Sequence, residues 1–172
     1  MAAETVLPTP SLSPRASFGL LAALIVLCLA VGWSGSLVTQ EQIPTWYAAL
    51  EKPAWTPPPA VFGPVWTVLY ILMGVAGWRV AKRDSPGHPA WGLWWIQLLL
   101  NAAWTPLFFG AHAITAAALL IGALWVAVAW FIGRTWRLDR VAAWCFVPYL
   151  LWITYAASLN IGVVTLNEAN GY

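Results

Sequence analysis

Long uncharged stretches divide the chain, and charged residues stand between them. The uncharged stretches cover 16–40, 53–78, 85–133 and 141–167, which are 25, 26, 49 and 27 residues long. An α-helix rises about 1.5 Å per residue and a bilayer's hydrocarbon core is about 30 Å thick, so one crossing takes about 20 residues. Each shorter stretch therefore predicts one crossing, and the longest predicts two, with a tight turn at 110–113.

The expected crossings are 18–38, 61–81, 90–109, 114–132 and 141–164. These runs show no period-two alternation and far exceed the roughly 10 residues of a membrane β-strand. The predicted fold class is therefore all-α, an integral membrane bundle of five transmembrane helices in one domain.

The segments outside these crossings are shorter. Residues 1–17 contain three prolines with one Glu and one Arg, which predicts a disordered N-terminal tail. The membrane domain is expected over 18–166, followed by a C-terminal tail at 167–172. The first apolar run is longer than the 7–15-residue core of a signal peptide and lacks a small-residue cleavage site, so it predicts a retained helix.

Composition supports a membrane protein. Of 172 residues, 61% are hydrophobic and only 8% are charged, whereas soluble domains carry about 25% charged residues. A soluble fold is excluded because so few charges cannot cover the surface of a globule. The net charge of +2 and the lack of a long basic run also exclude a nucleic-acid partner.

Positive charge is unevenly divided between the two ends of the predicted bundle. Seven basic residues fall on one side and Lys52 alone falls on the other. In a bacterial cell membrane, the expected host, the positive-inside rule places the N-terminus and the loops 82–89 and 133–140 in the cytoplasm. Segment 39–60 and the C-terminus are then outside.

Few residues of the predicted interior suit redox, metal or transport chemistry. No charged residue lies in the middle of a crossing, which disfavours pumps and coupled transporters. His88 and His112 fall on opposite sides, so they cannot form a bis-histidine haem clamp. Cys28 and Cys145 lie in apolar runs and are expected to be small buried residues. We therefore expect no metal site and no required cofactor.

Aromatic and neutral polar side chains recur at helical spacing on three predicted helices. A buried amide is costly in hydrocarbon unless it is paired, so Gln97, Asn101 and Asn160 are expected to point inward. They serve either as contacts between helices or as ligand contacts. Most tryptophans are expected to pack or to anchor the chain at the interface, and those near crossing ends fit an aromatic belt: Trp78, Trp91, Trp94, Trp95, Trp136 and Trp144.

The segment between the first two crossings is rich in proline and aromatic residues. Four prolines between 53 and 59 fix backbone angles and remove hydrogen-bond donors. Trp46, Tyr47, Leu50 and Trp55 supply apolar area. Segment 39–60 is therefore expected to fold over the bundle mouth as a lid, with Trp46, Pro53 and Trp55 as lid residues, or else to be an interfacial anchor.

Four motifs give the chain its resemblance to a known family. They are Trp-Tyr-x2-Leu-x-Lys-Pro-x-Trp-x-Pro-Pro at 46–58, Trp-Thr-x-Leu-Tyr-x2-Met-Gly at 66–74, Gln-Leu-x-Leu-Asn-x2-Trp at 97–104 and Pro-Tyr-Leu-x-Trp-x3-Ala-x2-Leu-Asn at 148–160. In this order they resemble the translocator protein family, also called tryptophan-rich sensory proteins or the TspO/MBR family. The resemblance implies a five-helix bundle, commonly a homodimer, with a pocket under the first loop for porphyrins, haem and drug-like lipophilic molecules.

The resemblance also implies roles for individual residues. Trp66 and Trp152 match the family's pocket tryptophans, Tyr47 matches the loop tyrosine, and Ala156 matches a small fifth-helix residue that affects ligand behaviour. Together with the helical faces, this predicts a ligand site made of Tyr47, Trp66, Tyr70, Gln97, Asn101, Trp104, Tyr149, Trp152 and Ala156.

The expected function is that of a membrane receptor or sensor for tetrapyrroles, linked to tetrapyrrole homeostasis and stress response. Two alternatives stay open. One is a light- and oxygen-dependent porphyrin-degrading enzyme, for which Trp66 and Trp152 are the candidate catalytic residues, and the other is a carrier of porphyrins or other lipophiles. The expected partners are the tetrapyrrole or lipophile, membrane lipid and a second copy of the chain. Small residues for close helix contact are Gly32, Gly35, Ala102 and Gly110.

Overall fold

The computed structural model describes residues 13–83 and 89–167, and within them every regular element is helical. This confirms the predicted all-α class. The long helices are α1 (Pro14–Gln42), α3 (Phe62–Arg83), α4 (Pro89–Thr105), α5 (Ile114–Leu138) and α6 (Arg140–Asn167), and the short elements are α2 (Trp46–Ala49), the 3-10 turn η1 (Pro59–Val61) and the π-helical turn η2 (Pro106–Gly110).

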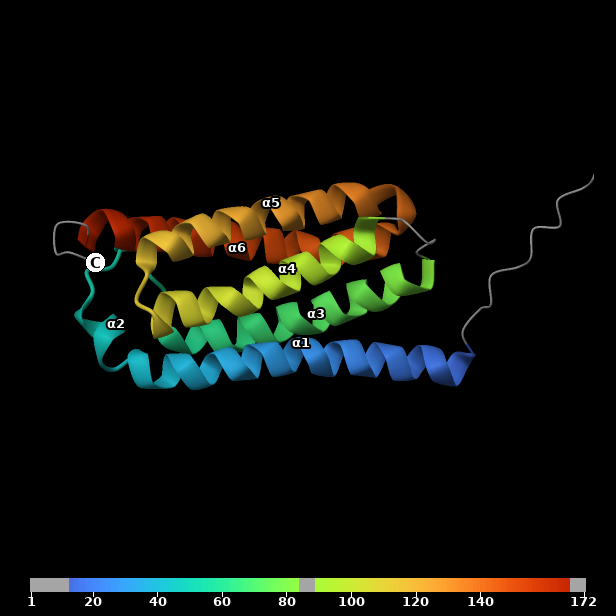
Figure 1. Ribbon diagram of the computed structural model, residues 1–172, viewed down its shortest axis with the longest axis horizontal. Coiled ribbons are helices and arrows are strands. Elements are labelled where there is room, and N and C mark those ends of the chain that lie inside the picture. Colours follow the sequence, from blue (N-terminus) through green and yellow to red (C-terminus); the bar gives the residue numbers. More distant parts are fainter. Residues whose placement is uncertain (1–12, 84–88, 168–172) are drawn as a thin grey trace, which may run out of the picture.

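The long helices lie side by side in one bundle (Figure 1). α1 packs on α3, α3 on α6, α6 on α5 and α5 on α4, and α4 with η2 returns to α1. The helices therefore surround a shared interior. At one end of the bundle lie α2 and the end of α6, and at the other lie the start of α1 and the turn between α5 and α6.

Four helical segments are long and apolar enough to cross a membrane: Pro14–Gln42, Pro59–Arg83, Ile114–Leu138 and Arg140–Asn167. They correspond to the first, second, fourth and fifth predicted crossings. The remaining predicted crossing corresponds to α4, which has only 17 residues, followed directly by the 5 residues of η2. The chain is thus a multi-pass membrane protein.

Several predicted boundaries are wrong. The lid was expected from residue 39, but α1 continues to Gln42, and Asn167, expected in the C-terminal tail, is the last residue of α6. The N-terminal tail was expected to reach residue 17, but α1 begins at Pro14, where the Ser13 side chain accepts a hydrogen bond from the Ala16 N–H at 3.3 Å. Proline at the first helical position suits a helix start. The expected loop 133–140 is helical as far as Leu138, because α5 continues past the apolar segment. The expected tail residues 1–12 and 168–172 lie outside the described residues.

Trp94 belongs to the core rather than to the interfacial belt predicted for it. Its side chain is fully buried, and its indole N–H donates to the Met73 carbonyl at 2.9 Å. A Cβ on Gly77 would lie 2.6 Å from the Trp94 ring. The absence of a side chain at Gly77 therefore lets a large indole pack directly on the α3 backbone.

The small residues of α1 and α3 make close contacts inside the bundle. A Cβ on Gly74 would lie 2.7 Å from the Ile25 Cα, and one on Gly32 would lie 2.3 Å from the Tyr70 ring. Gly35 faces Thr105. Gly32 and Gly35 are thus used within one chain, and the homodimer stays a prediction.

Candidate ligand cavity

A cavity of about 910 Å³ occupies the half of the bundle nearest α2. All five long helices contribute to its wall, and the segment between α1 and α3 covers it. The volume lies within the range of about 300–1,000 Å³ that is typical of small-molecule sites. The interior predicted from the helical faces is therefore hollow in this half.

Six of the nine predicted ligand residues line this cavity: Tyr47, Trp66, Tyr70, Asn101, Trp104 and Ala156. They come from four different elements, α2, α3, α4 and α6. The helical spacing thus correctly predicted inner helix faces, which the fold brings together around one cavity.

Aromatic rings form much of the wall. The Trp66 and Tyr70 rings stack with centroids 5.5 Å apart, and the Trp104 and Phe108 rings stack at 5.0 Å. Tyr47 approaches Phe109 from the lid with centroids 5.5 Å apart. Ring faces from α2, α3, α4 and η2 are therefore available to a flat apolar ligand.

Asn101 joins three helices through two hydrogen bonds. Its carbonyl oxygen accepts from the Tyr70 hydroxyl at 2.8 Å, and its amide nitrogen donates to the Tyr149 hydroxyl at 3.0 Å. Asn101 and Tyr149 are both buried. The amide at 101 is thus used between helices although it also lines the cavity.

Asn160 also joins three helices through two hydrogen bonds, at a position nearer to the lid. Its carbonyl oxygen accepts from the Trp104 indole N–H at 3.2 Å, and its amide nitrogen donates to the Ile114 carbonyl at 3.0 Å. The inward direction predicted for the buried amides is confirmed, since Gln97, Asn101 and Asn160 are all buried. The contacts observed for Asn101 and Asn160 join helices.

Three predicted ligand residues are not part of the cavity lining. Gln97 is buried in α4 and donates to the Trp94 carbonyl of its own helix at 2.9 Å. Tyr149 is fully buried, with its ring edge toward Trp66 at 6.1 Å between centroids. Trp152 packs against Phe62 with ring centroids 5.7 Å apart. Tyr149 and Trp152 thus pack against rings of the cavity wall without lining the cavity themselves: Tyr149 contacts Trp66, and Trp152 contacts Phe62.

Most hydroxyl groups of the lining are already bonded to their own backbone. Ser36 donates to the Trp33 carbonyl at 2.7 Å, Thr39 to Ser36 at 3.0 Å and Thr67 to Gly63 at 2.9 Å. These groups have no need of a ligand partner. The cavity therefore offers an interior that suits an apolar molecule.

The predicted lid lies over the cavity and is fixed to the end of α6. The Glu51 backbone N–H donates to the Asn167 side-chain oxygen Oδ1 at 3.1 Å, and the Asn167 side-chain nitrogen Nδ2 donates to the Glu51 backbone carbonyl at 2.9 Å. The Tyr155 hydroxyl donates to the Trp55 carbonyl at 2.7 Å. A Cβ on Gly162 would lie 2.3 Å from Pro53. Three positions on α6 therefore hold the lid.

The predicted lid residues have different environments. The Trp46 ring stacks on His112 with centroids 4.1 Å apart, and so joins the lid to the turn before α5. Pro53 packs on Gly162. The Trp55 side chain is 57% exposed, so this residue holds the lid through its backbone carbonyl rather than through its ring. Leu50 is buried against a cluster that includes Phe108 and Val163.

Lys52 is the charged residue of the lining. Its ammonium donates to the carbonyls of Leu50 at 2.6 Å and Tyr47 at 2.8 Å, and lies 5.0 Å from the Tyr47 ring centroid. Burial raises the pKa of the Tyr47 hydroxyl, so this group stays neutral. Within the described residues, Lys52 therefore brings a positive charge to the lid end of the cavity lining.

Comparison with known proteins identifies the family. The sequence profile of the TspO/MBR family matches residues 24–166. The chain belongs to the TspO/MBR family. It is 38% identical over 154 residues to the tryptophan-rich protein TspO of Chlorobaculum tepidum, covering 86% of this chain and 95% of that protein. It is 34% identical to protein CrtK of Rhodobacter capsulatus, covering 88% and 94%. The human translocator protein is 39% identical over 67% of this chain and 70% of its own length.

The family match includes both the lid and the cavity. Residues 24–166 contain every residue that lines the cavity. The chain is therefore a TspO/MBR membrane protein whose family region includes the whole lined space.

Several lining residues were absent from the predicted site of this TspO/MBR protein. Phe108 lies on the same helical row as Asn101, two turns further on, and Asn160 lies one turn beyond Ala156. Asn160 was expected to point inward, but neither residue was included in the predicted site. Lys52 was visible as the single basic residue at its end of the bundle. Asn167 does not line the cavity but holds the lid, and it gave no sequence signal, because this role depends on a contact across 116 positions.

Proposed function

We propose that this TspO/MBR protein is a membrane receptor that binds porphyrins or haem in the cavity beneath the lid. In this proposal the bundle has five crossings, and the third is the continuous helical segment of α4 and η2. Its 22 residues, 17 from α4 and 5 from η2, rise far enough to span about 30 Å.

The observation that carries the proposal is the chemistry of the wall. Stacked rings line a space of about 910 Å³, while the two asparagine amides of the lining are paired between helices. A ligand gains affinity there mainly by burying flat apolar area. A macrocycle is a suitable guest because it is planar and apolar over both faces.

The edges of a porphyrin carry carboxylates, which need a polar environment. Lys52 supplies positive charge at the lid. The Trp66 indole N–H has no hydrogen-bond partner within the described residues. We therefore expect the macrocycle to lie against Trp66, with its carboxylate edge toward Lys52.

Titration of intrinsic tryptophan fluorescence with protoporphyrin in the dark tests this function. Loss of one stacked ring costs about 0.5–1.5 kcal/mol beyond buried area, so Trp66→Leu should weaken binding by about tenfold. Trp144→Leu is the control, because Trp144 is 60% exposed on the outside of α6. Equal affinity in wild type, Trp66→Leu and Trp144→Leu would refute the proposed site.

Light-dependent porphyrin degradation is a second candidate function, favoured by the Trp66 and Tyr70 stack at 5.5 Å. An indole against the macrocycle can donate an electron to the photoexcited porphyrin, with dioxygen as the oxidant. Illumination of the bound complex separates the two functions. If Trp66→Phe keeps dark affinity but no longer bleaches the porphyrin, the protein is a degrading enzyme; if wild type does not bleach it, the receptor function stands alone.

A further inference from the structure

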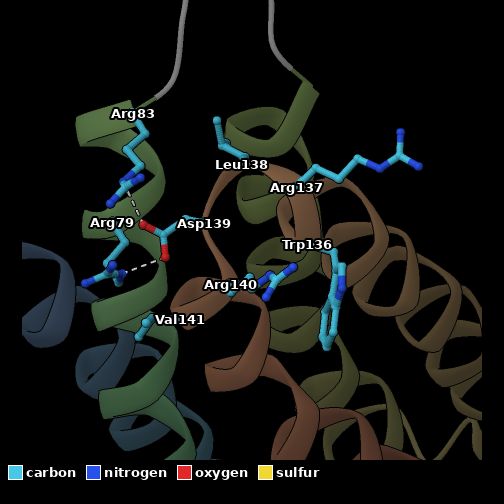
Figure 2. A pocket seen from close by; sticks show the side chains of 8 residues that line it. All are labelled: Arg79, Arg83, Trp136, Arg137, Leu138, Asp139, Arg140 and Val141. Atoms are coloured by element: carbon cyan, nitrogen blue, oxygen red, sulfur yellow. Dashed lines mark hydrogen bonds and ion pairs between the residues drawn. The ribbon is translucent and has the colours of Figure 1, made fainter.

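A second hollow lies at the opposite end of the bundle from the ligand cavity. It has a volume of about 520 Å³ and is formed by the end of α3, the end of α5 and the start of α6 (Figure 2). Four arginines line it, together with one acidic residue and three apolar residues: Arg79, Arg83, Arg137, Arg140, Asp139, Trp136, Leu138 and Val141. We call this hollow the arginine cleft.

Asp139 organises one wall of the arginine cleft. One carboxylate oxygen lies 2.8 Å from the Arg79 Nε, and the other lies 2.8 Å from the Arg83 Nε. The Asp139 side chain is 1% exposed, and it also accepts the Ala142 N–H at 3.0 Å. Burial alone would raise the pKa of this carboxyl, but the Arg79 hydrogen bond, the Ala142 N–H and the two arginine charges lower it. Asp139 is therefore a fixed anion.

This arrangement leaves guanidinium groups free for an external anion. Arg79 and Arg83 use their Nε atoms on Asp139, and no bond from their terminal nitrogens occurs within the described residues. Arg137 and Arg140 are exposed and have no ion-pair partner in the same part of the chain. The lining of the arginine cleft thus holds four positive charges and one carboxylate, which leaves three positive charges in excess among the residues described.

The position of the arginine cleft indicates which class of anion could bind there. The cleft lies where the apolar helices α3 and α5 end, at the depth of lipid headgroups if these helices span the bilayer. Trp136 is 41% exposed and Val141 is 49% exposed, so its rim also offers apolar contact. In Figure 2 the Arg140 and Trp136 side chains lie beside each other, on the opposite side of Asp139 from Arg79 and Arg83. Guanidinium groups bind phosphate oxygens in a bidentate manner.

We propose that the arginine cleft binds the phosphate headgroup of an anionic phospholipid. Arg137 and Arg140 contact the phosphate together with the terminal nitrogens of Arg79 and Arg83, and the acyl chains lie along the exposed apolar surface of α5 and α6. The site is separate from the ligand cavity and does not depend on porphyrin binding.

Native mass spectrometry of the full chain, released from detergent, tests the proposal. The protein is titrated with phosphatidylglycerol and, separately, with phosphatidylcholine. Wild type is expected to retain one phosphatidylglycerol and to prefer it over phosphatidylcholine. Arg137→Gln/Arg140→Gln should weaken phosphatidylglycerol binding by about tenfold or more, since each basic residue near an anionic surface contributes about fivefold.

The control removes the same charge at the same end of the bundle but outside the cleft. Lys82→Gln/Arg134→Gln deletes two cations that lie over the rings of Trp78 and Trp130. This variant should bind phosphatidylglycerol like wild type. Equal weakening of phosphatidylglycerol binding in both double variants, or no weakening in either, would overturn the proposal that the arginine cleft binds the lipid.

A third arm distinguishes a lipid from a soluble phosphate. Inorganic phosphate is added at millimolar concentration to the complex with phosphatidylglycerol. Retention of the lipid supports a headgroup site that also uses acyl contact. Displacement of the lipid by inorganic phosphate would overturn the lipid assignment.

Discussion

The reciprocal hydrogen bonds between Asn167 and Glu51 predict that one side chain controls how readily the lid opens. Asn167→Ala removes both bonds, at 3.1 and 2.9 Å. Each such bond contributes about 0.5–1.5 kcal/mol net, so the substitution should favour lid opening by about 1–3 kcal/mol, or about 5-fold to 150-fold.

The bundle itself should not unfold in this variant. The lid keeps the Tyr155 bond to the Trp55 carbonyl and the Trp46 stack on His112. The change is therefore expected in the lid equilibrium rather than in global stability. Bound porphyrin should dissociate faster by the same factor if it leaves through the lid.

Hydrogen exchange of the segment 46–58 and the dissociation rate of protoporphyrin measure this effect. Both rates should rise in Asn167→Ala. Thr165→Ala is the matched control, since its exposed hydroxyl bonds back to the Gly162 carbonyl at 3.0 Å and does not reach the lid. If both rates in Asn167→Ala equal those in Thr165→Ala, the reciprocal bonds do not hold the lid.

Three further predictions concern the bundle. Gly74→Ala places a Cβ 2.7 Å from the α1 backbone and should destabilise the protein by about 1–3 kcal/mol in thermal unfolding, whereas Gly122→Ala, with no atom within 4 Å, should not; equal losses would contradict the close contact. Because the pKa of Asp139 is lowered in the folded state, its stabilisation is present above about pH 4 and lost as pH falls through the lower folded value. The stability difference between wild type and Asp139→Asn should therefore shrink below about pH 4, and a constant difference would be inconsistent with a charged Asp139. Finally, a double-mutant cycle of Tyr70→Phe with Asn101→Leu should give a coupling of about 0.6–1.7 kcal/mol; additive losses would mean that their hydrogen bond does not stabilise the bundle.

The features that follow from local periodicity could be predicted from the sequence. Trp66, Tyr70 and Ala156 reach one cavity because residues at helical spacing share a face, and each helix could be assigned its inner face separately. The buried amides were placed correctly for the same reason, since hydrocarbon leaves them only an inward direction. The lid was predictable because its prolines and aromatic residues are contiguous in the chain.

The features that depend on contacts between distant segments could not be predicted in this way. Trp94 lies near a helix end, as belt residues do, and only its contact with Gly77 shows that it is buried. Tyr149 shares a helical row with Ala156, but the ring of Trp66 lies in front of it. Asp139 meets the arginines of α3 across about 60 positions. Single-helix patterns carry no information on such pairings.

Filling the cavity is the most direct test of the claim that a porphyrin binds there. Ala156 lines the cavity, whereas the next residue, Ala157, does not. The shift of the protoporphyrin absorption band on binding should be measured in Ala156→Phe and in Ala157→Phe. We predict that Ala156→Phe weakens binding by about 5-fold to 150-fold, the cost of about 1–3 kcal/mol for overpacking, and that Ala157→Phe binds as wild type does. Wild-type affinity in Ala156→Phe, or an equal loss in both variants, would contradict the account.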